Sequence, residues 1–204
     1  MLNSLLKHVA VSAFGKVNDA IEKHDVTVKE RQNEDFKNLL EFYKNNNYAG
    51  LVWVEEKTEE NNTKNICVFD REDRIIFRAK SRFNGNDLVI DIWDQNNNCI
   101  AYLTTISSIL DKQGDKLKFS ISIYGRYAHG VIINRGAFNS SAIVLGKGWR
   151  IYTQNKELVI VDNNRRILAE VKKRIGNKCI AGIHCNESFL CFILLIMSLM
   201  VSMY

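Results

Sequence analysis

A series of short segments in which apolar and polar residues alternate is the feature that most constrains the fold. From Tyr48 onward about twelve such segments follow one another, rich in Ile, Val, Phe, Tyr and Trp and separated by Gly, Asn or Asp. The segment "LKFSISI" (117–123) alternates without interruption. Because successive strand side chains point to opposite faces, this pattern predicts strands with one buried face. Many short strands with few helices between them predict an antiparallel sandwich or a closed barrel.

Three of the predicted hairpins share one sequence form: a strand, an Asp, a few polar residues and a second strand. They are "VFDREDRIIFRAK" (68–80), "DIWDQNNNCIAYLTT" (91–105) and "VIVDNNRRILAEVKK" (159–173). An Asp side chain accepts hydrogen bonds from the backbone two residues further on and so nucleates a turn. We therefore interpret Asp70, Asp94 and Asp162 as turn formers rather than as metal-binding or catalytic carboxylates.

The first 47 residues have a helical pattern. Apolar residues recur at spacings of three and four between Leu2 and Ile21, on one face of an amphipathic helix. Asp25 and Thr27 interrupt the pattern, and Thr27 to Glu30 has the form of a capping box, which predicts the start of a second helix. Both helices are expected to pack on the main domain or on each other. The alternative is a membrane-surface or partner-binding role for the first helix.

The C-terminal segment carries no charged residue from Phe189 to Tyr204. A helix that is apolar all round is surrounded by protein core or by lipid. Sixteen residues at about 1.5 Å each reach roughly 24 Å, less than the roughly 30 Å of a bilayer's hydrocarbon core. The length favours a buried helix over 188–204, and a tail anchor is the alternative.

Strands and tail together predict a mainly β fold: a closed antiparallel barrel of about twelve strands around a central hydrophobic C-terminal helix, with N-terminal helices. The predicted domains are an N-terminal helical segment, 1–47, and a barrel domain, 48–204, that includes the central helix 188–204. A sheet that wraps a helix buries every face of that helix, which accounts for the uncharged tail.

The order and shape of four segments resemble a known family. These are "ICVFDREDRIIFRAK", "LVIDIWDQNNNCIAYLTT", "KGWRIYTQNKELVIVDNNRRILAEVKKR" and the apolar tail. Residues 48–204 look like the tubby C-terminal-like superfamily, most of all its LURP-one-related and phospholipid-scramblase-like members. The resemblance implies a twelve-stranded barrel around a central C-terminal helix. It also implies a role in binding, since tubby members bind phosphoinositides and scramblase-like members are linked to lipid movement and calcium.

Positive charge is concentrated in the second half of the chain. From Lys112 to Lys178 there are 14 Lys and Arg against 4 Asp and Glu. Such a surface is either simply solvated or attracts a phosphate-bearing partner. A lipid headgroup is favoured over nucleic acid, because no RNP-type stretch is present. The candidate lipid- or anion-binding residues are Lys147, Arg150, Arg165, Arg166, Lys172, Lys173, Arg174 and Lys178.

Catalytic and metal-binding patterns are weak in this sequence. No Gly-x-Ser-x-Gly elbow occurs, and His129 and His184 have no recognisable catalytic partner. Cys179, His184 and Cys185 fall in one predicted strand, where neighbouring residues face opposite sides and cannot share one ion. We therefore expect no enzymatic activity, no metal and no cofactor. An enzyme with a ligand cavity at the barrel mouth is the weaker alternative.

The sequence thus predicts a non-enzymatic, tubby-like binding module that contacts anionic membrane lipid, or a protein partner through its N-terminal helices, and no nucleic acid. The alternative is a tail-anchored membrane protein that displays a cytosolic β domain. Five cysteines in apolar stretches are expected to be buried reduced thiols, which favours a cytoplasmic, peripheral-membrane location. Lys7 and His8 interrupt the apolar run that a signal peptide would need.

Overall fold

The computed structural model describes residues 2–59, 63–85, 87–106, 116–123, 126–134, 140–144, 148–154, 157–186, 191 and 193–196. Helix α1 spans Leu2–Asn45. The strands are β1 (Leu51–Thr58), β2 (Lys64–Phe69), β3 (Ile75–Asn84), β4 (Asp87–Asp94), β5 (Cys99–Ile106), β6 (Lys116–Ile123), β7 (Arg126–Asn134), β8 (Ser140–Val144), β9 (Trp149–Gln154), β10 (Glu157–Val161), β11 (Ile167–Ile175) and β12 (Lys178–Ile183).

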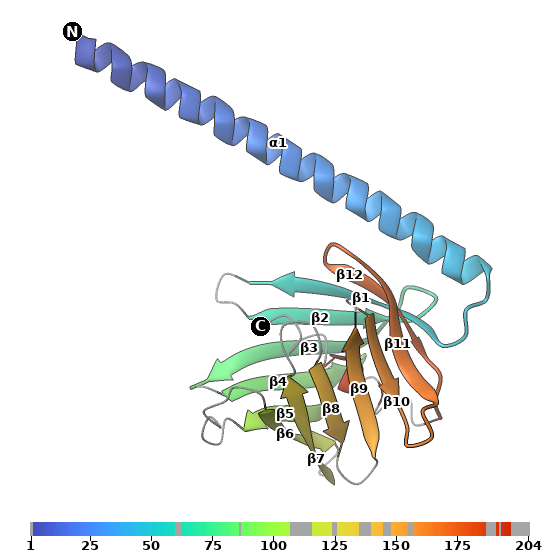
Figure 1. Ribbon diagram of the computed structural model, residues 1–204. Helices are drawn as coiled ribbons and strands as arrows, with labels where there is room; N and C mark the ends of the chain where they lie inside the picture. The colour runs from blue at the N-terminus through green and yellow to red at the C-terminus, as the bar shows by residue number, and fades with distance from the viewer. Residues whose placement is uncertain are drawn as a thin grey trace.

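The strands form one antiparallel sheet that closes into a barrel (Figure 1). Each strand pairs with its neighbours in the chain, and β1 also pairs with β12, where Leu51 lies opposite Gly182. In this order, every connection from an even-numbered strand to the next odd-numbered strand falls at the same end of the barrel. We call this end the aspartate rim, because the turns at 70–74, 94–98 and 162–166 lie there. The opposite rim carries the β11–β12 turn at 176–177.

The three aspartate turns have the same hydrogen bonds, which confirms their prediction as turn formers. Each Asp Oδ1 accepts from the backbone N–H groups two and four residues later, at 2.8 to 3.0 Å. Each turn also has one residue of positive φ at its fourth position, a conformation that Asn and Asp tolerate best among residues with a side chain. These residues are Asp73 (62°), Asn97 (63°) and Arg165 (63°).

The barrel interior contains both inward strand side chains and part of the C-terminal segment. Cys191 and Ile193–Ile196 have helical conformation and are at most 1% exposed. They pack in the same hydrophobic core as Val54, Ile66 and Ile90. The described part of the uncharged tail is therefore surrounded by protein.

The fold prediction is wrong in its helices. The expected break near Thr27 does not occur, and α1 is a single helix of 44 residues. The Thr27 hydroxyl donates to the Lys23 carbonyl at 2.9 Å, the bond of a Thr inside a helix and not of an N-cap. Of the long helix predicted over 188–204, the structure describes only Cys191 and Ile193–Ile196, so no long central helix is present among the described residues. The remaining residues of that prediction lie outside the described ranges.

Helix α1 contacts the barrel through its C-terminal part. Phe36 and Leu40 are buried against Leu51 of β1 and Ile180 of β12, on the outside of the sheet. The helix continues past the edge of the barrel, and its N-terminus lies far from every strand (Figure 1). No helix in the described part of the chain has the length and apolarity that a membrane span requires.

The charge of the turn aspartates should contribute to stability above acid pH. Hydrogen bonds from the side chain and backbone of Asn98 lower the pKa of Asp94. A folded-state pKa below the unfolded value of about 3.9 stabilises the fold above that pH, and this contribution disappears as pH falls through the folded pKa. We expect Asp94→Asn, which keeps an acceptor oxygen, to destabilise the protein near neutral pH and much less near about pH 2. Urea unfolding of both proteins across this range measures the difference, and a difference independent of pH would contradict it.

Because the described part of the tail is buried, shortening one of its side chains should lower the free energy of unfolding substantially. Leu195 is fully buried, so Leu195→Ala should lower the free energy of unfolding by about 2–5 kcal/mol. Ile167 is 45% exposed and serves as the matched control, for which Ile167→Ala should cost less than about 1 kcal/mol. Thermal or urea unfolding compares the two. Equal, small effects would show that Leu195 is not part of the core.

Candidate functional site

The candidate basic residues do not form one site, because the topology separates them. Arg150, Arg165 and Arg166 lie at the aspartate rim, where Arg150 pairs with Val161 at the start of the 162–166 turn. Arg174 and Lys178 flank the turn at the opposite rim. Strand β11 joins the two groups, and its nine residues at about 3.3 Å each extend roughly 30 Å. Basic residues that are close in sequence therefore lie far apart in the folded barrel.

A β-bulge also changes the expected faces of β11. The sequence predicts that Lys172 and Arg174 share a strand face and that Lys173 opposes them. The register shifts between Val171 and Lys173, so that Arg174 pairs with the inward-facing Cys179 while Lys172 reaches Glu170 on the outside. The bulge thus sends Lys172 and Arg174 to opposite faces.

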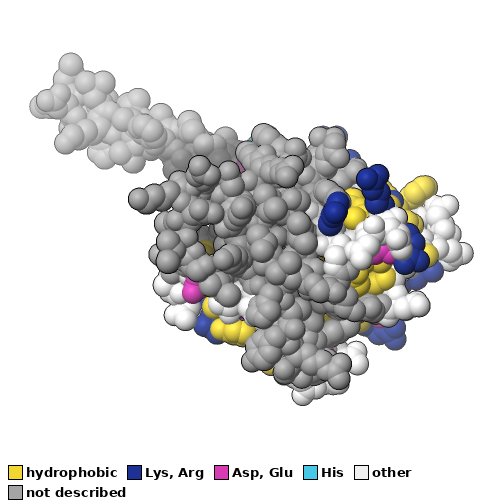
Figure 2. All heavy atoms as spheres, turned by 60° about the horizontal axis from the view of Figure 1, so that its bottom comes forward, with side chains coloured by type: hydrophobic (Ala, Val, Ile, Leu, Met, Phe, Trp, Pro, Cys, Tyr) yellow, Lys and Arg dark blue, Asp and Glu magenta, His cyan; other side chains and the backbone are white. Residues whose placement is uncertain are grey.

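Four of the candidate residues lie against carboxylates of the same chain. The pairs are Arg166–Asp162 at 2.7 Å, Lys172–Glu170 at 2.7 Å, Arg174–Glu56 at 3.0 Å and Lys178–Glu55 at 3.8 Å. Arg150, Arg165 and Lys173 are exposed, while Lys147 lies outside the described residues. Figure 2 shows Lys and Arg side chains dispersed among hydrophobic and uncharged ones on the described part of one face. The described part of the barrel surface therefore offers scattered cations and no single built anion site.

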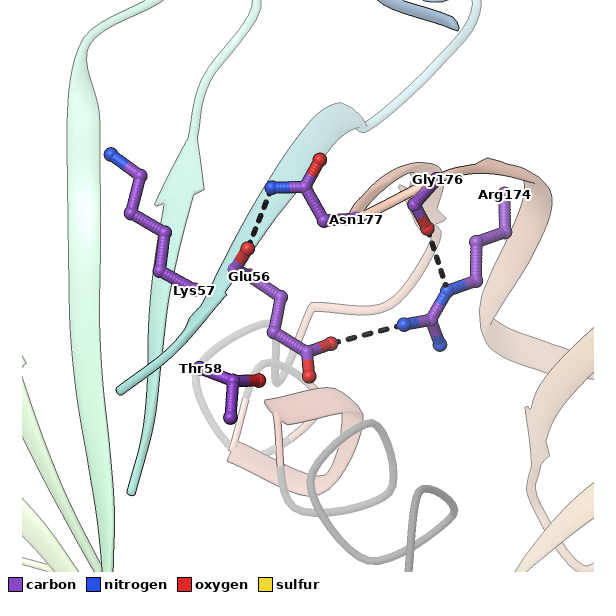
Figure 3. A pocket seen from close by; sticks show the side chains of 6 residues that line it. All are labelled: Glu56, Lys57, Thr58, Arg174, Gly176 and Asn177. Atoms are coloured by element: carbon purple, nitrogen blue, oxygen red, sulfur yellow. Dashed lines mark hydrogen bonds and ion pairs between the residues drawn. The ribbon is translucent and has the colours of Figure 1, made fainter. Parts of the chain in front are cut away.

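A hollow of about 570 Å³ opens at the opposite rim. It is lined by Glu56, Lys57, Thr58, Arg174, Gly176 and Asn177 (Figure 3). Glu56 follows the inward-facing Val52 and Val54 on β1, so its carboxylate points into the barrel mouth. There it meets the guanidinium of Arg174 at 3.0 Å and the Lys64 ammonium at 3.9 Å.

The charge cluster of Glu56, Arg174 and Lys64 links neighbouring strands at this rim of the barrel. Burial raises the pKa of Glu56, and the neighbouring Arg174 and Lys64 oppose that shift. Burial also lowers the pKa of Lys64, opposed by Glu56. The Asn177 side chain donates to the Glu56 carbonyl at 2.7 Å, and Arg174 Nε donates to the Gly176 carbonyl at 3.4 Å. These bonds join β1 to the β11–β12 turn, which indicates a structural role for the lining residues. That the protein is not an enzyme stays a prediction.

A polar cluster that the sequence did not predict lies on the outside of the barrel beneath the end of α1. The Tyr48 hydroxyl donates to Glu170 at 2.7 Å, and His184 Nε2 lies 3.1 Å from the same carboxylate oxygen. Burial and then the hydrogen bond to Glu170 raise the pKa of Tyr48. A Cβ at Gly182 would lie 2.7 Å from the Tyr48 hydroxyl and 2.8 Å from His184, so glycine leaves the space that this cluster occupies. The cluster joins Tyr48, in the segment that follows α1, to Glu170 of β11 and to His184 after the end of β12.

The end of α1 is fixed by a second set of contacts at the aspartate rim. Lys44 and the Trp53 indole both donate to Asp73, at 2.7 and 2.8 Å. Arg71 donates to the Lys44 carbonyl near the C-terminus of the helix. Unpaired helix carbonyls are commonly satisfied by a basic side chain in this way. The direction in which α1 leaves the barrel is therefore set by specific bonds as well as by packing.

Among the described residues, the fold does not bring the candidate zinc ligands Cys179, His184 and Cys185 together as a metal site. Within the described residues, no three His, Cys, Asp or Glu side chains are grouped so that they could hold a metal ion. His184 faces Glu170 on the outer surface, whereas Cys179 is buried in the core. His129 belongs to β7, but its side chain is outside the described part of the structure.

Comparisons of this chain with protein-family models, with curated proteins and with solved structures find no match. The resemblance to tubby-like proteins therefore stays a prediction.

The contribution of the Glu56, Arg174 and Lys64 cluster to stability can be tested by removing the charge of Glu56. Glu56→Gln would leave the cations of Lys64 and Arg174 beside a neutral amide in a largely buried place. We expect it to lower the free energy of unfolding by about 3 kcal/mol. Glu59→Gln is the matched control: Glu59 is exposed, and the loss of its charge should lower the free energy of unfolding far less than Glu56→Gln does. Chemical denaturation measures both, and equal costs would show that the Glu56 cluster does not stabilise the rim.

Proposed function

We propose that this chain is a non-enzymatic binding module that attaches to anionic membrane surfaces through the N-terminal half of α1. In this proposal the barrel is a rigid domain that the helix holds at the membrane. The observation that carries it is an amphipathic helix that projects from the barrel, with no described strand of the barrel beside its N-terminal half (Figure 1).

The projecting part of the helix is long. Among the side chains that the structure describes, the first contact of α1 with the barrel is at Gln32, which lies beside Gly176, and the residues from Glu22 to Asp35 are exposed. About 30 residues therefore precede the docked part, and at about 1.5 Å each they extend roughly 45 Å. Such a length separates the N-terminal half from the barrel far enough for it to meet a different surface.

The apolar face of the N-terminal half is not a continuation of the docked face. Its positions run from Leu2 to Ile21 at the helical repeat, whereas the docked face is centred on Phe36 and Tyr43. Counted at about 100° per residue, the two faces are rotated by roughly a third of a turn. The N-terminal apolar face therefore serves a contact other than the one with β1 and β12.

Two lysines flank this face. At the helical repeat, Lys16 falls at one border of the apolar face and Lys7 falls about 40° beyond the other border. Asp19 lies as far from the centre of the face as Lys7 does, and Glu22 lies opposite it. A lysine at such a border keeps its stem with the apolar face and its ammonium at the level of the lipid phosphates. An in-plane helix of this kind buries its apolar side in the boundary between headgroups and acyl chains.

Two further points support the same proposal. The resemblance of residues 48–204 to tubby-like proteins implies contact with anionic lipid. Exposed cations on the barrel, such as Arg150, Arg165 and Lys173, add attraction to an anionic surface at close range. The alternative of a tail anchor is less favoured, because Cys191 and Ile193–Ile196 lie in the barrel core.

The experiment is co-sedimentation of the full chain with vesicles of phosphatidylcholine, with and without phosphatidylserine. We expect binding to the anionic vesicles. Val9→Asp, at the middle of the apolar face, should weaken it at least about tenfold because it removes buried apolar surface. Ser4→Asp introduces the same charge on the polar side and should weaken binding by less than about threefold. Replacing both Lys7 and Lys16 by Gln should weaken binding to anionic vesicles by roughly tenfold or more and leave neutral vesicles unaffected.

Thermal unfolding controls for folding, since none of these positions belongs to the docked part of α1. No binding of the unmodified chain, or equal effects of Val9→Asp and Ser4→Asp, would overturn the proposal. A concentration-dependent dimer that Val9→Asp dissociates, without any vesicle binding, would assign the apolar face to a second copy of the chain.

A further inference from the structure

Two cysteines approach each other where the C-terminal segment enters the barrel. The Sγ atoms of Cys185 and Cys191 are 2.7 Å apart, and no disulfide joins them. A disulfide needs about 2.05 Å between the sulfur atoms, so a small adjustment of the two side chains closes the gap.

The two thiols belong to different parts of the fold. Cys185 follows the end of β12 by two residues, at the aspartate rim, and is half-buried. Cys191 is fully buried and leads into Ile193–Ile196 within the core. The sequence-based expectation that all five cysteines are buried is wrong for Cys99, which is exposed, and for the half-buried Cys67 and Cys185.

We propose that Cys185 and Cys191 form a reversible disulfide that locks the C-terminal core segment to the end of β12. The thiolate of one cysteine attacks a small-molecule disulfide such as oxidised glutathione and forms a mixed disulfide, releasing one glutathione. The second thiolate then displaces the remaining glutathione. Overall two protein thiols lose two protons and two electrons, and one oxidised glutathione becomes two reduced molecules.

The bond would act on the part of the structure that fills the barrel. A closed loop of seven residues restricts the unfolded chain and the local opening of the segment. In a reducing compartment the pair stays open, and the segment is held by packing alone. Under oxidising conditions the same segment becomes covalently tied to the sheet. This inference is independent of the proposed membrane attachment, which depends on the other end of the chain.

The experiment is equilibration of the full chain in buffers of oxidised and reduced glutathione, followed by thiol counting and peptide mass analysis. We expect two of the five thiols to disappear together, with a Cys185–Cys191 cross-linked peptide two mass units lighter than the reduced pair. The oxidised protein should unfold at a temperature roughly 5–10 °C higher than the reduced protein.

Cys185→Ser should abolish both the cross-link and the temperature shift, and Cys99→Ser should leave both unchanged. Cys191→Ser provides a second loss-of-bond variant from the buried side. Stable glutathione adducts at Cys185, a cross-link to a different cysteine, or five free thiols in the most oxidising buffer would each overturn the proposal.

Discussion

The pairing of β1 with β12 is the interaction on which the rest of this structure depends. It removes both edges of the sheet and encloses the interior in which Ile193–Ile196 are buried. The same two strands present Leu51 and Ile180 to the outside, where α1 docks. One strand pair therefore closes the core and carries the helix, so any loss of this pairing would affect the tail and the helix together.

Closure also decides where charge can lie. A charged side chain that points inward at the barrel mouth needs a partner of opposite charge. The carboxylate of Glu56 has two such partners, Arg174 and Lys64. Outward positions remain in water and pair locally, as Lys172 does with Glu170. Among the residues that the structure describes, the cations are divided between two rims and two faces and form no concentrated anion site. The membrane proposal for that reason rests on α1, and the barrel cations have a secondary part in it.

Local chemistry made several elements predictable. The turns at Asp70, Asp94 and Asp162 depend on bonds within five residues, so the sequence pattern was sufficient to identify them. The break predicted at Thr27 failed for a comparable reason. A Thr followed by Glu three residues later has the same form at an N-cap and inside a helix, and only the bond from Thr27 to Lys23 distinguishes the two.

The sequence by itself determined the alternating segments, their turns, the amphipathic N-terminal half of the helix and the uncharged tail, because each depends on neighbours within one or two turns of chain. Only the tertiary structure decided that β1 meets β12, that Arg174 turns inward at a bulge, and that Cys185 faces Cys191. These contacts depend on strand register and closure. A register change of one residue reverses every face of a strand. The pairing of β1 with β12 joins segments far apart in the chain, and the two cysteines belong to different parts of the fold, beyond the reach of a local pattern.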